Sequence, residues 1–355
     1  MTPMPTGPLR TLRVGFMPLV DCAPLLAAAR LGLDRRYGLR LELLRQGSWA
    51  AVRDKLLSGE LDAAHALAGM VYGIEAGIGG PRGQMALLMV LNQNGQAIVL
   101  APGAAQALGA GASLREALRV STAHAPKLAQ TFPTGTHAMW LYYWLAAQGI
   151  DPLHEVQALT LSPAEMPAAL ARGEIDGYCA GEPWAARAES LGAGVRVIRS
   201  DQIWPGHPEK VLACRRSFAA LEPDTATALT AAVLEACRWL DEDPEHRRQA
   251  ATWLAEGAID LPAAQLADCL RPAGDSRLRF HGDGAVNFPW LSDGRWFLHQ
   301  FRRWGWLGPD AAGDDALLAE VHRIDSYRLA ALQAGVSLPR GDSRTSVLFD
   351  GMRWE

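Results

Sequence analysis

Short apolar runs alternate with amphipathic stretches over the first hundred residues of the chain. Strands are predicted at residues 12–16, 39–44, 61–67, 87–91 and 97–100. Helices are predicted between the first of these strands, at residues 23–31 and 48–57. Ser48 is placed to cap the second helix, because its hydroxyl can accept a hydrogen bond from a free N–H group of the first turn. Strands that alternate with helices predict parallel α/β sheets.

The same pattern continues for another hundred residues and then changes. A helix is predicted at residues 135–148, and strands at residues 156–161, 177–180, 195–198 and 211–214. Beyond about residue 215 the helical period dominates, with helices expected at 223–241, 244–256, 262–270, 294–303 and 314–334. The final stretch, 335–355, contains the apolar triplet Val347-Leu348-Phe349 and fits a docking arm as well as a packed extension.

An internal echo links the two α/β segments. Residues 48–62 read SWAAVRDKLLSGELD and residues 162–176 read SPAEMPAALARGEID, with Ser, Leu, Gly, Glu and Asp at matching places. Each unit predicts a capped helix, a glycine stop and a strand. The echo indicates two related lobes, and two lobes that face each other form a cleft that closes on a ligand.

Composition and charge exclude several classes of protein. The chain has 355 residues, a net charge of −4, and 31 Arg against only three Lys. No block of like charge marks a nucleic-acid face, so we expect no direct contact with RNA or DNA. No run of 18 uncharged apolar residues predicts a membrane span. Residues 1–19 lack the pattern of an export signal, which predicts a cytoplasmic protein.

The sequence contains none of the common motifs for catalysis. GxxxxGK[ST], GxSxG and HExxH are missing, and no GxGxxG opens a helix after a strand. The five cysteines stand singly, without CxxC spacing, and predict buried thiols rather than disulfides or zinc ligands. We therefore expect no enzymatic activity, no cofactor and no metal site.

Four polar segments interrupt the apolar pattern where predicted elements join, at residues 47–49, 92–96, 132–137 and 206–210. Ligands of open α/β sheets bind beside such loops, at the carboxyl ends of strands. The candidate donors are the indole of Trp49, the amide of Gln96, the imidazole of His137 and the ammonium of Lys210. Thr136 and His137 lie in the first turn of their helix, where free N–H groups and the helix dipole favour an anion. These groups predict a site for one small oxyanion.

Each of these residues also has a structural explanation. Trp49 fits simple packing at a helix start, Gln96 fits a loop amide that satisfies backbone groups, and His137 fits a helix cap or a core position. Trp140 and Trp144 are four residues apart and favour a core role over a binding role. From the residues alone both explanations stay open.

Six ordered stretches carry a resemblance to a known family. They are VGFMPLVDCAPL (14–25), GSWAAVRD (47–54), NGQAI (94–98), FPTGTHAMWL (132–141), DGYCAGEPW (176–184) and HPEK (207–210). They resemble the nitrate/bicarbonate-binding proteins of ABC transporters, the NrtA/CmpA type. The resemblance implies a type II periplasmic-binding-protein-like fold, with two α/β lobes around a ligand cleft and a helical C-terminal third. Lobe I would comprise residues 8–95 and 208–334, lobe II residues 96–207, and a C-terminal extension residues 335–355.

The resemblance also implies a ligand. Carried over by motif, the contacts to nitrate fall on Trp49, Gln96, His137 and Lys210. The position of Lys210 is one where nitrate and bicarbonate binders of the family differ. A cation suits an anion that has no proton to donate, which favours nitrate or nitrite.

Within the family, a member without an export signal resembles the cytoplasmic NasS-type nitrate/nitrite sensor. That resemblance implies an ANTAR-type RNA-binding antiterminator as partner (NasT-like), which the sensor holds and releases when the anion binds. The alternative is the substrate-binding component of a nitrate or bicarbonate ABC transporter. A third possibility is a cytosolic enzyme on the same fold, similar to the pyrimidine-precursor synthases of thiamin biosynthesis. Those enzymes use a Cys-rich or His-rich site that this sequence lacks.

Overall fold

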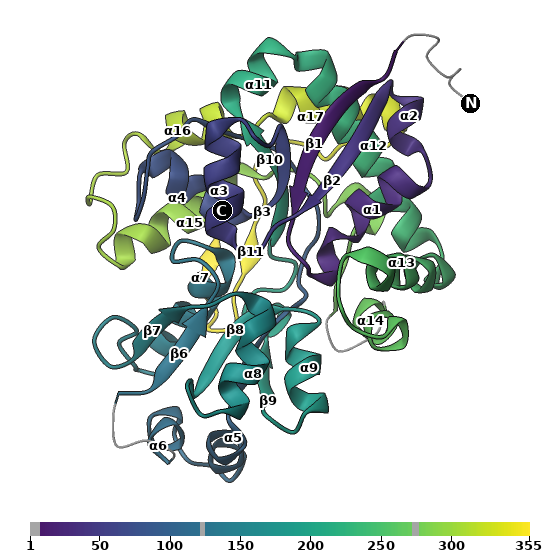
Figure 1. Cartoon of the computed structure of the whole chain (residues 1–355). Helices are drawn as coiled ribbons and strands as arrows, with labels where there is room; N and C mark the ends of the chain where they lie inside the picture. Colours follow the sequence, from purple (N-terminus) through teal and green to yellow (C-terminus); the bar gives the residue numbers. More distant parts are fainter. Residues whose placement is uncertain (1–7, 121–124, 272–276) are drawn as a thin grey trace.

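Two five-stranded sheets organise the chain (Figure 1), in a computed structural model that describes residues 8–120, 125–271 and 277–355. The first sheet has the order β2-β1-β3-β10-β4, with β1 Arg10–Phe16, β2 Leu39–Arg45, β3 Ala63–Leu67, β4 Met85–Val90 and β10 Lys210–Arg215. The second has the order β7-β6-β8-β5-β9, with β5 Gln96–Leu100, β6 Lys127–Gln130, β7 Gln157–Thr160, β8 Gly177–Gly181 and β9 Val195–Arg199. The first seven residues of the segment 1–19 lie outside the described residues.

The two α/β lobes are present, but their sheets are mixed rather than parallel. Strand β1 pairs parallel with β2 and β3, whereas β10 pairs antiparallel with β3 and β4. In the second sheet β5 runs antiparallel to β8 and β9. Strands β5 and β10 are those with which the chain enters one sheet from the other, so each runs against its neighbours. The prediction of parallel sheets is wrong for these two strands.

Helices cover both sheets. Those of the first segment are α1 Ala23–Arg30, α2 Leu33–Arg36, α3 Trp49–Ser58 and α4 Ala68–Ala76. Those between β5 and β10 are α5 Pro102–Gly109, α6 Leu114–Arg119, α7 Thr136–Ala147, α8 Met166–Ala171, α9 Trp184–Ser190 and α10 Ser200–Ile203. Those after β10 are α11 Arg216–Leu221, α12 Pro223–Glu242, α13 Pro244–Gly257, α14 Ala263–Leu270, α15 Leu291–Arg303, α16 Asp314–Val321 and α17 Ile324–Ala334. The last group surrounds the first sheet, which confirms a helical C-terminal third.

The single helix predicted at 314–334 is in fact two helices, α16 and α17. The chain is extended at His322 (φ −78°, ψ 121°), and the N–H of Arg323 donates to the Leu87 carbonyl at the edge of the first sheet. The His322 ring lies between the Tyr72 hydroxyl (2.9 Å) and the Pro289 carbonyl (2.9 Å). These tertiary hydrogen bonds replace the helical ones and break the helix, although the apolar period runs through the break.

The internal echo has a structural counterpart. The carboxylate of Asp62 accepts from the backbone N–H of Arg13 at 2.8 Å, and that of Asp176 accepts from the N–H of Lys127 at 2.8 Å. In each lobe the carboxylate thus joins the residue after the helix to a neighbouring strand of the sheet. The repeated aspartate therefore makes the same type of contact in both lobes.

The C-terminal stretch is a packed extension. It forms a small hairpin from β11 Ser346–Val347 and β12 Arg353–Trp354, with Leu348 buried. The N–H of Phe349 donates to the Ile203 carbonyl, and Asp350 accepts a hydrogen bond of 2.8 Å from the Tyr143 hydroxyl on α7. The extension therefore reaches across to the second lobe instead of standing free.

All five cysteines are buried, as the sequence predicts. Within the described ranges no helix is both long and apolar enough to cross a membrane. In the same part of the chain His, Cys, Asp and Glu form no group of three or more that fits a metal ion.

Candidate functional site

A cluster of five ionisable side chains lies where the two lobes meet. It consists of Asp21, His65, His137, Glu209 and Lys210, each at most 1% exposed, and we call it the interlobe cluster. The Lys210 ammonium donates to Asp21 Oδ2 at 2.9 Å and to Glu209 Oε1 at 2.6 Å. His65 Nε2 donates to Asp21 Oδ1 at 2.8 Å.

The strand order explains why these residues meet. Asp21 follows β1 in the short helix η1 (Val20–Cys22), and His65 lies on β3. Because β10 runs antiparallel to β3, its first residue, Lys210, pairs with Leu67 at the carboxyl end of β3. The carboxyl ends of β1 and β3 and the start of β10 therefore share one edge of the sheet. This is the edge where open α/β sheets bind ligands.

Glu209 joins this edge to helix α7 of the other lobe. Its Oε1 accepts from the Thr136 hydroxyl at 2.7 Å and lies 3.1 Å from His137 Nε2. Its Oε2 accepts from the Trp140 indole N–H at 3.2 Å. The start of α7, predicted as an anion-binding helix end, thus faces a carboxylate that belongs to the chain itself.

Burial and charge pairing set the protonation states of the cluster. Burial alone would lower the pKa of Lys210, but Asp21 and Glu209 outweigh it and raise the pKa above its ordinary value. Burial would raise the pKa of Glu209 and of Asp21, but the Lys210 ammonium holds both pKa values below the ordinary range, helped at Asp21 by the hydrogen bond from His65. Burial lowers the pKa of His65 and of His137. At neutral pH the cluster therefore holds two carboxylates, one ammonium and two neutral imidazoles.

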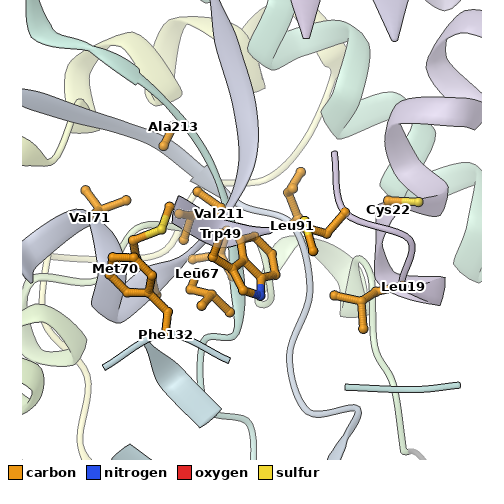
Figure 2. Close-up of a cluster of buried hydrophobic side chains, with 14 of the residues drawn as sticks. Leu19, Cys22, Trp49, Leu67, Met70, Val71, Leu91, Phe132, Val211 and Ala213 are labelled. Carbon is orange, nitrogen blue, oxygen red and sulfur yellow. The ribbon is translucent and has the colours of Figure 1, made fainter. Parts of the chain in front are cut away.

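Trp49 contributes an unpaired donor beside the cluster. Ser48 caps helix α3 by accepting from the Ala51 N–H, as predicted, and this fixes Trp49 in the first turn. The indole is buried, and its ring centroid lies 5.5 Å from that of His65 and 5.7 Å from the Lys210 ammonium. Figure 2 shows the indole nitrogen on an edge of the ring, among Leu19, Leu67 and other apolar side chains. Within the described structure this N–H has no hydrogen-bond partner.

His137 supplies a second donor without a well-formed hydrogen bond. Its Nδ1 lies 2.6 Å from the Thr131 hydroxyl. Its Nε2 lies 3.1 Å from Glu209, but the direction is not that of a hydrogen bond, and no other described residue accepts from it. A Cβ added to Gly181 would stand 3.7 Å from this nitrogen and 3.5 Å from Asp21 Oδ2. Leu19 Cδ2 would lie at only 3.2 Å from the same Cβ, so the glycine at position 181 allows the backbone of β8 to pack closely against both groups.

Gln96 differs from the other candidates. It begins β5 opposite Gly181, so its backbone lies one strand away from the cluster. Its amide N–H donates to the Asn94 carbonyl at 2.9 Å, and its amide oxygen accepts from the Ser200 hydroxyl at 3.0 Å. The structure therefore brings Trp49, Thr136, His137 and Lys210 to one place. The Gln96 amide instead forms its hydrogen bonds with Asn94 and Ser200.

Four residues of the site were not among the candidates from the sequence: Asp21, His65, Glu209 and Gly181. Two of them had a usable signal. Asp21 and His65 are single polar residues inside otherwise apolar runs, MPLVDCAP and AAHAL. A buried polar side chain needs a partner, so such isolated residues point to a buried network. Trp140, assigned to the core, is buried there and also donates to Glu209.

Two hydrogen bonds to backbone carbonyls join the lobes beside the cluster. The N–H of Val20 donates to the Glu182 carbonyl at 3.0 Å, and the indole N–H of Trp184 donates to the Pro18 carbonyl at 3.2 Å. Both bonds join the segment after β1 to the segment after β8. The site is therefore shut off from solvent in this conformation.

Known proteins with this fold include binding components of transporters. The NMT1-like family matches residues 6–255. The nitrate/nitrite binding protein NrtA of Synechocystis is 32% identical over 97% of this chain and 82% of its own length. A crystal structure of the periplasmic nitrate-binding protein NrtA from Synechocystis superposes with a TM-score of 0.89, covering 97% of this chain and 95% of that one.

Two further proteins extend the comparison. The nitrate import ATP-binding protein NrtC of Synechocystis is 33% identical, and this chain spans only about half of its length (53%). The alkanesulfonate-binding protein SsuA of Xanthomonas shares the fold at 17% identity, with a TM-score of 0.65 over 85% of this chain and 96% of its own. NrtA is named as a binding protein, which agrees with the binding role expected from the sequence. This chain has a periplasmic-binding-protein-like fold and belongs to the NMT1-like family, among the relatives of NrtA.

Proposed function

We propose that this protein binds nitrate or nitrite between its two lobes. The observation that carries the proposal is the pair of buried donors, Trp49 Nε1 and His137 Nε2, beside the Lys210 ammonium. A buried N–H group without a partner destabilises the fold by about 1–3 kcal/mol, so such groups are explained well by a ligand that accepts from them. A small planar oxyanion offers acceptors in several directions and no proton of its own.

The relatives support the same ligand. NrtA of Synechocystis is named for nitrate and nitrite, and it aligns with nearly all of this chain. NrtA proteins of Nostoc and Synechococcus elongatus match at 32% and 33% identity. The four predicted site residues that meet in the structure lie in the segments that carry the resemblance.

The role best supported is that of the substrate-binding component of a nitrate ABC transporter. One relative, NrtC, is named a nitrate import ATP-binding protein, and this chain matches about half of its length. A binding protein that closes on its ligand presents a different surface when loaded, and this difference is what a transporter needs to recognise.

The second candidate is a cytoplasmic nitrate/nitrite sensor that holds an ANTAR-type antiterminator and releases it on binding the anion. The observation in its favour is that Glu209 joins both lobes, so a change at the site changes how the lobes meet. Ligand and partner would then weaken each other's binding. Co-purification with a neighbouring ANTAR protein that nitrate disrupts would support the sensor, and binding to a permease that nitrate strengthens would support the transporter.

The anion itself is tested by calorimetric titration of the full chain with nitrate, nitrite and bicarbonate. Saturable one-to-one binding of nitrate or nitrite is expected. Binding of bicarbonate alone, or of none of the three anions, would contradict the proposal.

A further inference from the structure

Glu209 occupies donors that an external oxyanion would use. Its carboxylate receives the Thr136 hydroxyl, the Lys210 ammonium and the Trp140 indole, and it faces the His137 imidazole. Three of these four residues, Thr136, His137 and Lys210, are predicted anion contacts. A carboxylate is planar and spreads one negative charge over its oxygens, as nitrate and nitrite do. The site therefore already contains an oxyanion, which the chain itself supplies.

The charges of the interlobe cluster oppose the addition of another anion. Asp21 and Glu209 carry two negative charges, Lys210 carries one positive charge, and both imidazoles are neutral at pH 7. The cluster thus has one negative charge in excess, entirely out of contact with water. A bound monovalent anion would raise this excess to two. An uncompensated buried charge is strongly unfavourable, and a buried site responds by taking up a proton.

We propose that Glu209 is a built-in competitor for the anion, and that an external oxyanion enters together with a proton that the interlobe cluster takes up. This inference rests on the proposed function, because it describes how the same site accepts nitrate or nitrite. The proton neutralises the added charge, and Glu209 releases part of its donor set to the ligand.

The hydrogen bonds of the two imidazoles indicate where the proton goes. His65 Nδ1 accepts from the backbone N–H of Met17, while its Nε2 donates to Asp21. A backbone N–H can only donate, so this arrangement keeps His65 neutral. A proton on both nitrogens of His65 would break the bond from Met17.

His137 has no such restriction. Its Nδ1 faces the Thr131 hydroxyl, which donates to a neutral imidazole and accepts from a charged one. The charged groups that face His137 are Glu209 and Lys210 from the loop and start of β10, and Asp21 from η1. The first and last favour the imidazolium, and Lys210 opposes it. A bound anion beside His137 also favours the imidazolium form, so His137 is the proton acceptor.

The test counts protons during anion binding. Nitrate is titrated into the full chain by calorimetry at one pH, in two buffers of different ionisation enthalpy, and the titration is repeated from pH 6.5 to 8.5. The expected result is uptake of about one proton for each nitrate bound, with affinity falling about tenfold for each pH unit. Nitrate binding with no proton uptake and no pH dependence would overturn the inference while leaving the proposed function intact. A requirement for an added divalent cation in place of the proton would also overturn it.

The variant Glu209→Gln removes the excess charge and keeps the size of the side chain. Its proton uptake is expected to fall toward zero, and its nitrate affinity at pH 8 to rise at least tenfold above that of the unmodified protein. The matched control is Glu75→Gln. Like Glu209, Glu75 is buried and paired with a cation, but its partner is Arg216 and it lies outside the interlobe cluster. The control should keep the proton uptake and the pH dependence of the unmodified protein. A Glu209→Gln protein that binds nitrate with undiminished proton uptake would contradict the inference.

Discussion

Gly73 of helix α4 packs against Thr134 of the other lobe so closely that a Cβ on Gly73 would overlap the Thr134 hydroxyl oxygen. A Cβ on Gly69, one turn earlier, would likewise overlap the Thr134 carbonyl oxygen. Because glycine has no Cβ, Gly69 and Gly73 on α4 allow the loop before α7 to approach the first lobe. Because Thr136 and His137 follow directly on this loop, the contact places the predicted anion donors.

The change Gly73→Ala is expected to weaken nitrate binding by about 5- to 100-fold. A Cβ at this contact destabilises the closed form by about 1–3 kcal/mol through overpacking. Opening of the lobes relieves this strain, so the open form is favoured. Calorimetry measures the affinity, and small-angle scattering measures the opening. Gly257→Ala on α13 is the control, since a Cβ there meets no atom within 4 Å. Equal affinities for the two variants would show that the contact does not govern closure.

The change Trp49→Phe is expected to weaken nitrate binding about 10- to 100-fold with little change in melting temperature. It removes the unpaired indole N–H and keeps most of the buried ring, and a hydrogen bond to a charged group contributes about 1.5–3 kcal/mol. The control is Trp290→Phe, which removes another buried N–H without a partner, near Phe288 and away from the interlobe cluster. The assignment fails if Trp49→Phe binds nitrate as the control does.

The change Lys210→Met is expected to lower the melting temperature by roughly 10 °C at neutral pH. It leaves Asp21 and Glu209 buried without their cation, and breaking a buried ion pair in this way costs about 3–5 kcal/mol. Adding Glu209→Gln to Lys210→Met removes one of the stranded charges and should restore part of the stability. Thermal unfolding of the single and double variants measures both effects.

The pH dependence of this loss has a definite sign. In the unmodified protein the pKa values of Asp21 and Glu209 lie below their unfolded values, so their stabilisation is present above about pH 4.5 and is lost as the pH falls further. Without Lys210, burial raises the pKa of the same carboxylates, and they fold more easily when protonated. The loss of melting temperature caused by Lys210→Met should therefore be smaller at pH 5 than at pH 8. A deficit that grows toward acid pH would contradict the assigned charges.

Removal of residues 345–355 is expected to weaken nitrate binding several-fold and to lower the melting temperature by a few degrees. The extension bonds to Tyr143 and Ile203 in the second lobe, and the Trp354 indole donates to the Ser292 carbonyl in the first. It therefore holds the two lobes together in the closed form. Arg353→Ala, at an exposed position of the same extension, is the control and should bind nitrate normally. If the truncated protein bound nitrate with full affinity, the extension would not be needed to hold the lobes together in the closed form.

Much of the fold follows from local signals in the sequence. Apolar runs such as 12–16 and the cap at Ser48 predict β1 and α3 because strand burial and helix capping depend on neighbouring residues. The antiparallel direction of β10 and the break at His322 do not follow from local signals. Both depend on residues distant in the sequence, β3 in the first case and Leu87 in the second.

The same difference between local signals and distant contacts explains which residues of the site were predicted. Trp49 and His137 were predicted because each is an unusual polar group at the start of a helix. The partners Asp21 and Glu209 were missed because their importance comes from contacts between distant positions, Asp21 with Lys210 (189 residues apart) and Glu209 with Thr136 (73 residues apart). A sequence shows the donors, but only the fold shows that a carboxylate already occupies them.

A crystal structure of the protein grown with nitrate tests the central claim most directly. We expect one planar anion between the lobes, within about 3 Å of Trp49 Nε1 and His137 Nε2, with Glu209 turned away from part of its donor set. Nitrate bound elsewhere on the chain, or a saturated crystal in which both N–H groups remain without a partner, would contradict it.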